Sequence, residues 1–251
     1  MKISILTLFP EMFQGPFEHS ILKRAQEKEL VEIECINIRD FGIGSHKMVD
    51  DTPYGGGVGM VLKVDVLHKA IEYAKANYHR VILSASEESQ SNGDPSAKHQ
   101  DDKIKTWVIL TSASGEVFKQ QMAKQFSQLD HLIIICGHYE GVDDRIRNYI
   151  DEEVSIGDFV LTGGELPAML IADSIIRLID GVITQGATED ESFSEKNRTL
   201  LEYPHYTKPR TYEGHEVPEI LRSGNHKAID EWRAEKSLEK TKRVRPDLLK
   251  E

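Results

Sequence analysis

The chain has 251 residues, of which 39% are hydrophobic and 29% are charged, a composition typical of a folded globular protein with one or two domains. No apolar run approaches the roughly 18 residues that a membrane span requires, so we expect no membrane-spanning segment. The formal net charge of −11 argues against nonspecific binding to nucleic acid, because such binding depends on neutralising phosphates.

Residues 1–180 alternate between strand and helix patterns. Short β-branched or alternating runs predict strands over residues 3–9, 31–38, 81–83, 108–110 and 132–136. Apolar residues at helical spacing predict helices over residues 12–29, 64–76 and 165–180. The run over residues 132–136 is apolar at every position, which is typical of a central strand that is buried on both faces. The alternation therefore predicts an α/β fold in which helices flank a parallel sheet.

The start of the chain and its cysteines indicate a reducing compartment. The first six residues already alternate as a strand does, and they lack the apolar stretch and the small-residue cleavage site of a signal peptide. Cys35 and Cys136 lie in apolar, strand-like runs. We interpret them as buried thiols and not as a disulfide or zinc ligands, which predicts a cytoplasmic protein.

Two polar segments interrupt the alternation. Residues 84–106 hold one large apolar side chain, Ile104, and cannot bury enough surface to offset the entropy of ordering them. We interpret this segment as a disordered insertion. Residues 181–198 are interpreted as a linker between a first domain over residues 1–180 and a second over residues 199–251.

The second domain is predicted to be small and helical. Asn225 is suited to cap a helix over residues 226–238, and Ser223 to set up the preceding turn. Residues 236–250 contain six basic side chains against Glu239 and Asp247, a local net charge of +4. Charge alone leaves two interpretations, a solvated tail or a surface that binds nucleic acid.

The densest glycine cluster is Gly55-Gly56-Gly57-Val58-Gly59. Glycine permits positive φ angles and a close approach of the backbone to a ligand. A phosphate-binding loop would need a lysine and a hydroxyl residue at its end, and this cluster has neither. A ligand-binding loop and a flexible surface loop both fit the pattern.

Two further glycine clusters follow predicted strands. Residues 136–141 read Cys-Gly-His-Tyr-Glu-Gly and come directly after the buried strand, where ligands of open α/β sheets bind. Residues 155–167 place glycines on both sides of a short apolar run, and Pro167 then opens a helix. The backbone around Gly163 and Gly164 could wrap an adenine-sized ligand. For both clusters an ordinary turn is the alternative.

Arg177 is conspicuous on a nearly apolar helix. It is placed to pair with Asp173 four residues before it or with Asp180 three residues after it. A functional interpretation requires an anionic or carbonyl target instead.

In this order, the three glycine clusters resemble those of the bacterial tRNA (guanine-N1)-methyltransferase family (TrmD), which modifies guanine 37 beside the anticodon. The similarity covers nearly the whole chain, in the motifs at residues 5–13, 51–57, 137–141, 155–167, 192–194, 203–207 and 223–226. The resemblance implies a parallel sheet of the SPOUT class with a deep trefoil knot, an exception to general topology rules, and a C-terminal helical domain that binds tRNA. It also implies a homodimer with its active site at the interface, with no role for DNA or a membrane.

The family resemblance implies S-adenosylmethionine as methyl donor and leaves Mg²⁺ open as a further requirement. Three loops would hold the donor through Thr111, Ser112, Gly115, Gly137, Tyr139, Glu140, Gly141, Ile156, Gly157, Asp158, Phe159, Val160, Leu161, Gly163, Gly164 and Pro167. The residues expected at the tRNA are Asp50, Gly55, Gly56, Gly57, Gly59, Ser223, Asn225, His226, Lys240, Lys242 and Arg243.

The catalytic groups also follow from the resemblance. Removing the N1 proton of guanine moves negative charge to O6, which Arg177 would stabilise in the transition state. The family has the sequence Asp-Ser-Phe, in which the aspartate acts as the general base. At the position of that aspartate this chain has Glu191, with Asp190 as an alternative base. The chain also has Ala113 where the family loop commonly has proline.

Two other functions fit parts of the sequence. A non-catalytic tRNA-binding protein on the same scaffold could have lost Arg177, the carboxylate or the glycine turns, but all of these are present. An enzyme that acts on nucleotide phosphates would need a lysine and a hydroxyl residue in the loop over residues 55–59, and both are lacking.

Overall fold

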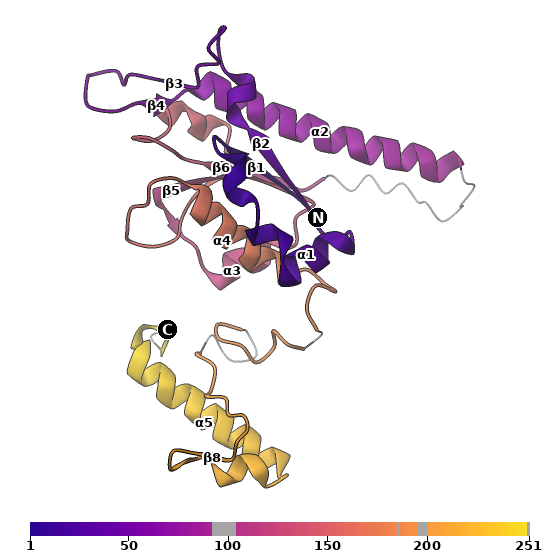
Figure 1. Ribbon diagram of the computed structural model, residues 1–251, viewed down its shortest axis with the longest axis vertical. Helices are drawn as coiled ribbons and strands as arrows, with labels where there is room; N and C mark the ends of the chain where they lie inside the picture. Colours follow the sequence, from indigo (N-terminus) through magenta and orange to yellow (C-terminus); the bar gives the residue numbers. More distant parts are fainter. Residues whose placement is uncertain (92–103, 185, 195–199, 250–251) are drawn as a thin grey trace. The chain divides into compact units, whose positions relative to one another are not determined.

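The computed structural model describes residues 1–91, 104–184, 186–194 and 200–249 (Figure 1). The chain folds into two compact units, Met1–Ile183 and Thr184–Glu251. None of the helices among these described residues combines the length and the apolar character needed to cross a membrane.

The first unit is built on a sheet of five parallel strands in the order β2-β1-β6-β5-β7. The strands are β1 (Lys2–Thr7), β2 (Glu32–Asn37), β5 (Thr106–Val117), β6 (His131–Cys136) and β7 (Glu152–Ser155). Every residue of β6 is buried, and β6 is the middle strand. The predicted parallel sheet and its buried central strand are thereby confirmed.

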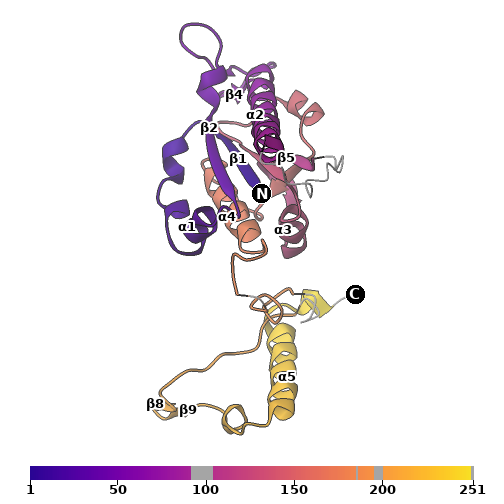
Figure 2. The same cartoon turned by 90° about the vertical axis from the view of Figure 1, so that its right-hand side faces the viewer.

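Helices cover both faces of this sheet (Figure 2). One face carries α1 (Ser20–Glu27), α3 (Gln120–Phe126) and α4 (Glu165–Ile176). The opposite face carries α2 (Val64–Ser91). The alternation of side chains along each strand divides the apolar residues between two cores, since successive residues point to opposite faces.

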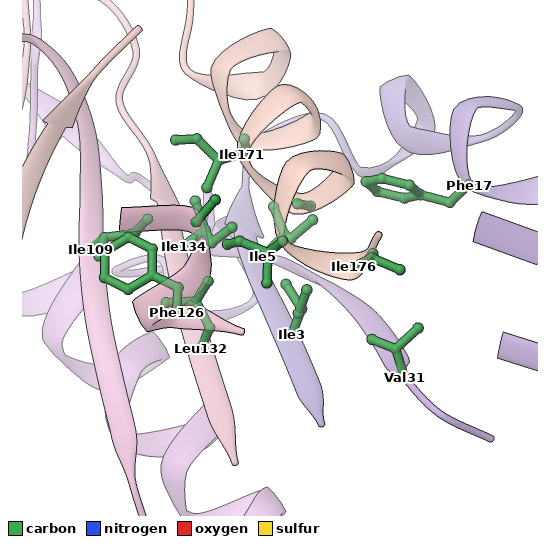
Figure 3. Close-up of a cluster of buried hydrophobic side chains, with 14 of the residues drawn as sticks. Ile3, Ile5, Phe17, Val31, Ile109, Phe126, Leu132, Ile134, Ile171 and Ile176 are labelled. Carbon is green, nitrogen blue, oxygen red and sulfur yellow. The ribbon is translucent and has the colours of Figure 1, made fainter. Parts of the chain in front are cut away.

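The core under α4 is dense in isoleucine. Ile171 and Ile176 of α4 lie over Ile3, Ile5 and other strand residues, as Figure 3 shows. On the other face, the α2 side chains of Leu67 and Ile71 pack with the β6 side chains of Ile133 and Ile135. Each of these side chains is fully buried and contributes about 1.5–3 kcal/mol relative to exposure. The two cores hold the strands in place, and so they also position the loops that follow the strands.

The helix predicted over residues 12–29 is broken in the structure. Two short 3₁₀ turns, η1 (Pro10–Phe13) and η2 (Pro16–Glu18), precede α1. The break falls where Gly15 adopts a φ of +92° and Pro16 follows it. Proline has no N–H to continue a helical hydrogen-bond ladder, so the apolar periodicity alone was misleading.

The structure also differs from the predictions around the expected insertion. Residues 81–83, predicted as a strand, and residues 84–91 belong to α2, because extending an existing helix costs little once it is nucleated. At the other end, Thr106 begins β5 opposite His131, and the Lys105 N–H donates to Asp130 at 2.8 Å. The rest of the expected insertion, residues 92–103, lies outside the described residues.

Smaller elements complete the first unit. They are η3 (Ile38–Phe41), the hairpin of β3 (Asp50–Asp51) with β4 (Val61–Leu62), and η4 (Asp144–Asn148). Cys136 is fully buried and Cys35 is partly buried, and neither forms a disulfide. Burial raises the pKa of the Cys35 thiol to about 11, so it stays protonated at neutral pH.

The second unit is organised around α5 (His226–Val244). The Asn225 side chain accepts a hydrogen bond from the Ala228 N–H at 3.3 Å, and the Ser223 hydroxyl accepts one from the Asn225 N–H at 3.1 Å. The predicted cap and turn are therefore confirmed, although the helix runs six residues beyond the predicted end at residue 238. The unit also contains β8 (Thr211–Tyr212), β9 (His215–Glu216), η5 (Glu219–Arg222) and η6 (Pro246–Leu249).

Candidate functional site

A cavity of about 440 Å³ opens at the carboxyl ends of β5, β6 and β7. This is where ligands of open α/β sheets bind. Three loops form its walls, and the lining residues lie within 110–114, 137–142, 153–156 and 159–164, together with Asp144, Ile146, Arg147 and Pro167. All of them belong to the first unit.

The three loops meet at Thr111, Gly137 and Gly164. The Thr111 hydroxyl donates to the carbonyl of Ile135 at 3.0 Å, and the Gly164 N–H donates to the carbonyl of Gly137 at 2.7 Å. A Cβ on Gly164 would lie 2.6 Å from the Gly137 nitrogen and 2.8 Å from the Cys136 Cα. Only glycine fits there, so backbone forms this wall of the cavity.

The end of β5 is irregular where it borders the cavity. Its pairing with β7 shifts register between Thr111 and Glu116, so the intervening residues bulge out of the ladder. A Cβ on Gly115 would lie 2.5 Å from the backbone of Glu153 and Val154. Gly115 therefore packs against a strand, while Ser112 and Ala113 face the cavity.

Most residues that the resemblance assigns to the donor line this cavity. They are Thr111, Ser112, Gly137, Tyr139, Glu140, Gly141, Ile156, Phe159, Val160, Leu161, Gly163, Gly164 and Pro167. Gly115, Gly157 and Asp158 do not line it. Gly157 has a φ of +142° and shapes the turn after β7.

Sequence reasoning missed the charged rim of the cavity. Asp144 and Arg147 of η4 and Glu153 of β7 line it, and so does His138 within the second glycine cluster. His138 lies between the rings of Phe9 and Tyr139, at centroid distances of 5.1 and 4.7 Å. The presence of a charged residue, Glu153, inside a short parallel strand was the sequence signal that could have indicated this rim.

The loop over residues 55–59 joins β3 to β4 beside the cavity. The Glu140 N–H donates to the Met60 carbonyl at 3.1 Å, and a Cβ on Gly59 would collide with the Glu140 side chain. Tyr54 and Val58 are 100% and 92% exposed, so this loop presents apolar side chains to solvent. Asp50 lies in β3, at the base of the same hairpin.

A second cavity, of about 630 Å³, is lined by residues 51–54 and 61–65 of this hairpin and by residues 142–145. Two of its acidic side chains are paired with basic ones. Lys63 lies 3.2 Å from Asp51, and Arg145 donates to both oxygens of Asp143 at 2.9 and 2.5 Å. These pairings hold the pKa of the Asp143 carboxyl below its usual range, chiefly through the Arg145 hydrogen bonds.

Arg177 stands at the far end of α4 from the cavity. It is the C-cap residue and is partly buried, and its N–H donates to the Asp173 carbonyl at 3.2 Å. The cavity borders Gly164, the N-cap of the same helix. Because an α-helix rises about 1.5 Å per residue, some 20 Å of helix separate the two ends.

The carboxylates Asp190 and Glu191 belong to the second unit. The Ser192 hydroxyl accepts from the Glu202 N–H at 2.9 Å, and the Phe193 N–H donates to the Leu200 carbonyl at 3.0 Å. These bonds attach the segment to residues 200–202, which pack on α5. Asp190 is exposed and Glu191 is partly buried.

The basic residues of α5 differ in their surroundings. Lys240 donates to the Glu202 carbonyl at 3.0 Å and so helps to hold residues 200–202 on the helix. Lys242 and Arg243 are exposed in the last turn. Ser223, Asn225 and His226 lie at the opposite end of α5, at its N-terminus. In the described part of the chain, no group of three or more His, Cys, Asp or Glu residues is arranged to hold a metal ion.

Known proteins resemble this chain along its whole length. Residues 1–251 match the family model described as tRNA (Guanine-1)-methyltransferase TrmD. A protein of Carboxydothermus hydrogenoformans named tRNA (guanine-N(1)-)-methyltransferase is 50% identical over 252 residues, covering 100% of this chain and 88% of that protein. Proteins with the same name from Alkaliphilus metalliredigens and Staphylococcus epidermidis are 50% and 47% identical and cover 100% of this chain, which matches 92% and 91% of their respective lengths.

Proposed function

The chain belongs to the tRNA (guanine-1)-methyltransferase family, and we propose that it transfers a methyl group from S-adenosylmethionine to N1 of guanine 37 in tRNA. The observation that carries the proposal is the family match over the whole chain, joined to a cavity at the carboxyl ends of three parallel strands. The alternative of a non-catalytic tRNA-binding protein loses its support, since the curated relatives are named as enzymes.

The cavity fits the donor in size and in lining. Its volume of about 440 Å³ lies within the range of about 300–1,000 Å³ common for small-molecule sites. Backbone at Gly137 and Gly164 can approach a flat base closely, and Ile156 and Leu161 add apolar surface. S-adenosylmethionine supplies an electrophilic methyl group when bound. The meeting of the three loops at Thr111 supports a SPOUT-type knot, with β5, β6 and β7 as its strands.

The chemistry requires a cation and a base at the guanine. Arg177 is proposed to stabilise the negative charge that develops on O6, and Glu191 to accept the proton from N1. Asp190 is the alternative base, although it is the more exposed of the two side chains.

A homodimer would bring Arg177 to a donor site. Within one subunit, the length of α4 keeps Arg177 away from the cavity, so the arginine at the guanine would come from the partner subunit. Leu166 and Leu170, one helical turn apart on α4, are 53% and 46% exposed, and Met12 and Ile21 are also exposed. Uncovered apolar side chains of this kind support an interface between two copies of the chain.

The second unit is proposed to bind tRNA through Lys242 and Arg243, with Ser223, Asn225 and His226 at the start of α5. Asp50 and the glycine loop over residues 55–59 would contact the tRNA beside the donor cavity. A requirement for Mg²⁺ and the cytoplasmic location stay predictions.

Single-turnover methylation of tRNA with three variants tests the catalytic assignment. Arg177→Ala should slow methyl transfer about 100- to 1,000-fold, as the loss of one donor to a developing oxyanion does. Glu191→Gln should slow it comparably, while the matched control Asp190→Asn should stay near wild type. Donor binding should be unchanged in all three. A severe loss of rate in Asp190→Asn, with a normal rate in Glu191→Gln, would assign the base to Asp190 instead of Glu191. A normal rate for Arg177→Ala would contradict the role proposed for this arginine.

A further inference from the structure

Acidic side chains outnumber basic ones in the lining of the donor cavity. Its lining includes three acidic side chains, Glu140, Asp144 and Glu153, and one arginine, Arg147. The proposed donor carries two positive charges, on its sulfonium and ammonium groups, and one negative charge, on its carboxylate. The single cationic side chain of the lining therefore corresponds in sign to the single anionic group of the donor.

Two carboxylates hold the Arg147 side chain in place. Its Nε donates to Oδ1 of Asp144 at 2.6 Å, and its Nη2 lies 3.0 Å from the Glu153 carboxylate. The Glu153 side chain is only 12% exposed, whereas that of Arg147 is 53% exposed. A guanidinium has five N–H donors, so these two contacts leave others for a ligand at the exposed edge. The hydrogen bond to Asp144 and the charge of Glu153 raise the pKa of Arg147, which stays cationic at any physiological pH.

The planar guanidinium matches a carboxylate in shape as well as in charge. Arginine binds carboxylates through two parallel N–H donors, which fixes the orientation of the bound group. The lining also includes glycine backbone and the apolar side chains of Ile156 and Leu161, surfaces that suit the flat adenine. The lining thus combines charged side chains from η4 and β7 with apolar and glycine surface from residues 156–167.

We propose that Arg147 binds the carboxylate at the methionine end of the donor and so sets the direction in which the donor lies in the cavity. This inference rests on the proposed function, because it assumes S-adenosylmethionine as the ligand. Asp144 and Glu153 orient the guanidinium through their contacts with it.

Arg145 provides a matched control two residues away. It belongs to the same 3₁₀ turn, and its guanidinium is paired with Asp143. It lines the second cavity and not the donor cavity. Arg145→Gln therefore removes the same charge from the same element without touching the proposed contact.

Titration calorimetry with two ligands tests the inference. The ligands are S-adenosylmethionine and its decarboxylated form, which lacks only the carboxylate. Arg147→Gln should raise the Kd of S-adenosylmethionine by at least about tenfold, as expected for losing a charge-assisted hydrogen bond. It should not weaken binding of the decarboxylated ligand. Arg145→Gln should leave both Kd values at the wild-type level.

The double variant Arg147→Gln with Glu153→Gln separates ligand binding from local damage, because it removes the largely buried carboxylate that would otherwise lose its partner, while Asp144 is exposed to solvent. It should reproduce the selective loss for the ligand that carries a carboxylate. Equal weakening of both ligands by Arg147→Gln and by the double variant would overturn the inference, as would no weakening of either. A wild-type chain that binds neither ligand would instead refute the proposed function itself.

Discussion

Three residues far apart in the sequence join the loops that line the proposed donor cavity. Thr111, Gly137 and Gly164 come from three loops, and their backbones and one hydroxyl are joined by hydrogen bonds of 2.7 to 3.4 Å. A Cβ on Gly164 would collide with the Thr111 hydroxyl and with the backbone of Cys136 and Gly137, and backbone cannot turn aside as a side chain can. The cavity wall thus has almost no tolerance for added volume at this position.

Gly164→Ala should abolish donor binding, because the added methyl group would force the loops after β5 and β6 away from the start of α4. Titration calorimetry with S-adenosylmethionine measures this loss. Gly163→Ala is the comparator, since the nearest atoms there belong to the side chains of Glu165 and His138, which can shift, and its loss should be smaller. Wild-type affinity in Gly164→Ala would show that the donor binds elsewhere.

At the scale of single elements, sequence patterns predicted the elements that alternating side chains mark. They failed where the backbone conformation of a few residues interrupts an element. The strand β6 was predictable because apolar residues mark both of its faces, and β1 because its isoleucines recur at alternate positions. The helix over residues 12–29 was not, because Gly15 and Pro16 break it locally. Glycine motifs pointed to the loops that line the cavity, but Arg147 and Glu153 meet only through the turn of η4 and the start of β7, which no spacing reveals.

The amino end of β6 contains a buried histidine whose protonation is linked to stability. The His131 side chain is fully buried, and its Nε2 lies 2.9 Å from the Ser4 hydroxyl. Burial, followed by the charges of Lys2 and His79, lowers the pKa of His131 to about 4. A pKa below that of the unfolded chain, about 6.5, means that the unfolded state binds the proton more readily. The stabilisation is therefore complete above pH 6.5 and is lost as the pH falls toward 4.

The free energy of unfolding should fall by about 2 kcal/mol between pH 6.5 and pH 5 through this histidine. Urea denaturation of the wild type and of His131→Gln at several pH values measures the effect. The variant should show a correspondingly shallower pH dependence, whatever its absolute stability. Parallel curves for the two proteins would assign the acid sensitivity to other groups.

The last turn of α5 is where tRNA affinity is expected to reside. Lys242→Glu with Arg243→Glu should raise the KM for tRNA and flatten its salt dependence, because fewer phosphates are neutralised. Donor binding should not change. Lys240 is left intact, since its bond to the Glu202 carbonyl supports the fold of the second unit. An unaltered KM would place the tRNA contact on another surface.

At the scale of the whole molecule, the proposed reaction needs groups that come from separate parts of the chain. The donor cavity and Arg177 lie at opposite ends of α4, and Asp190 and Glu191 belong to the second unit. A dimer and a bound tRNA would together complete the site. The cavity could be anticipated from local motifs, whereas the proposed catalytic groups would depend on an assembly that no local pattern encodes.

The most direct test of the account is methyl transfer to defined tRNA transcripts, with the modified position read by mass spectrometry. The account predicts 1-methylguanine at position 37 in a transcript with guanine there, and no transfer when that guanine is replaced by adenine. Arg177→Ala serves as the inactive control with an intact donor cavity. Equal methylation of both transcripts, or methylation at another nitrogen or position, would contradict the proposed function.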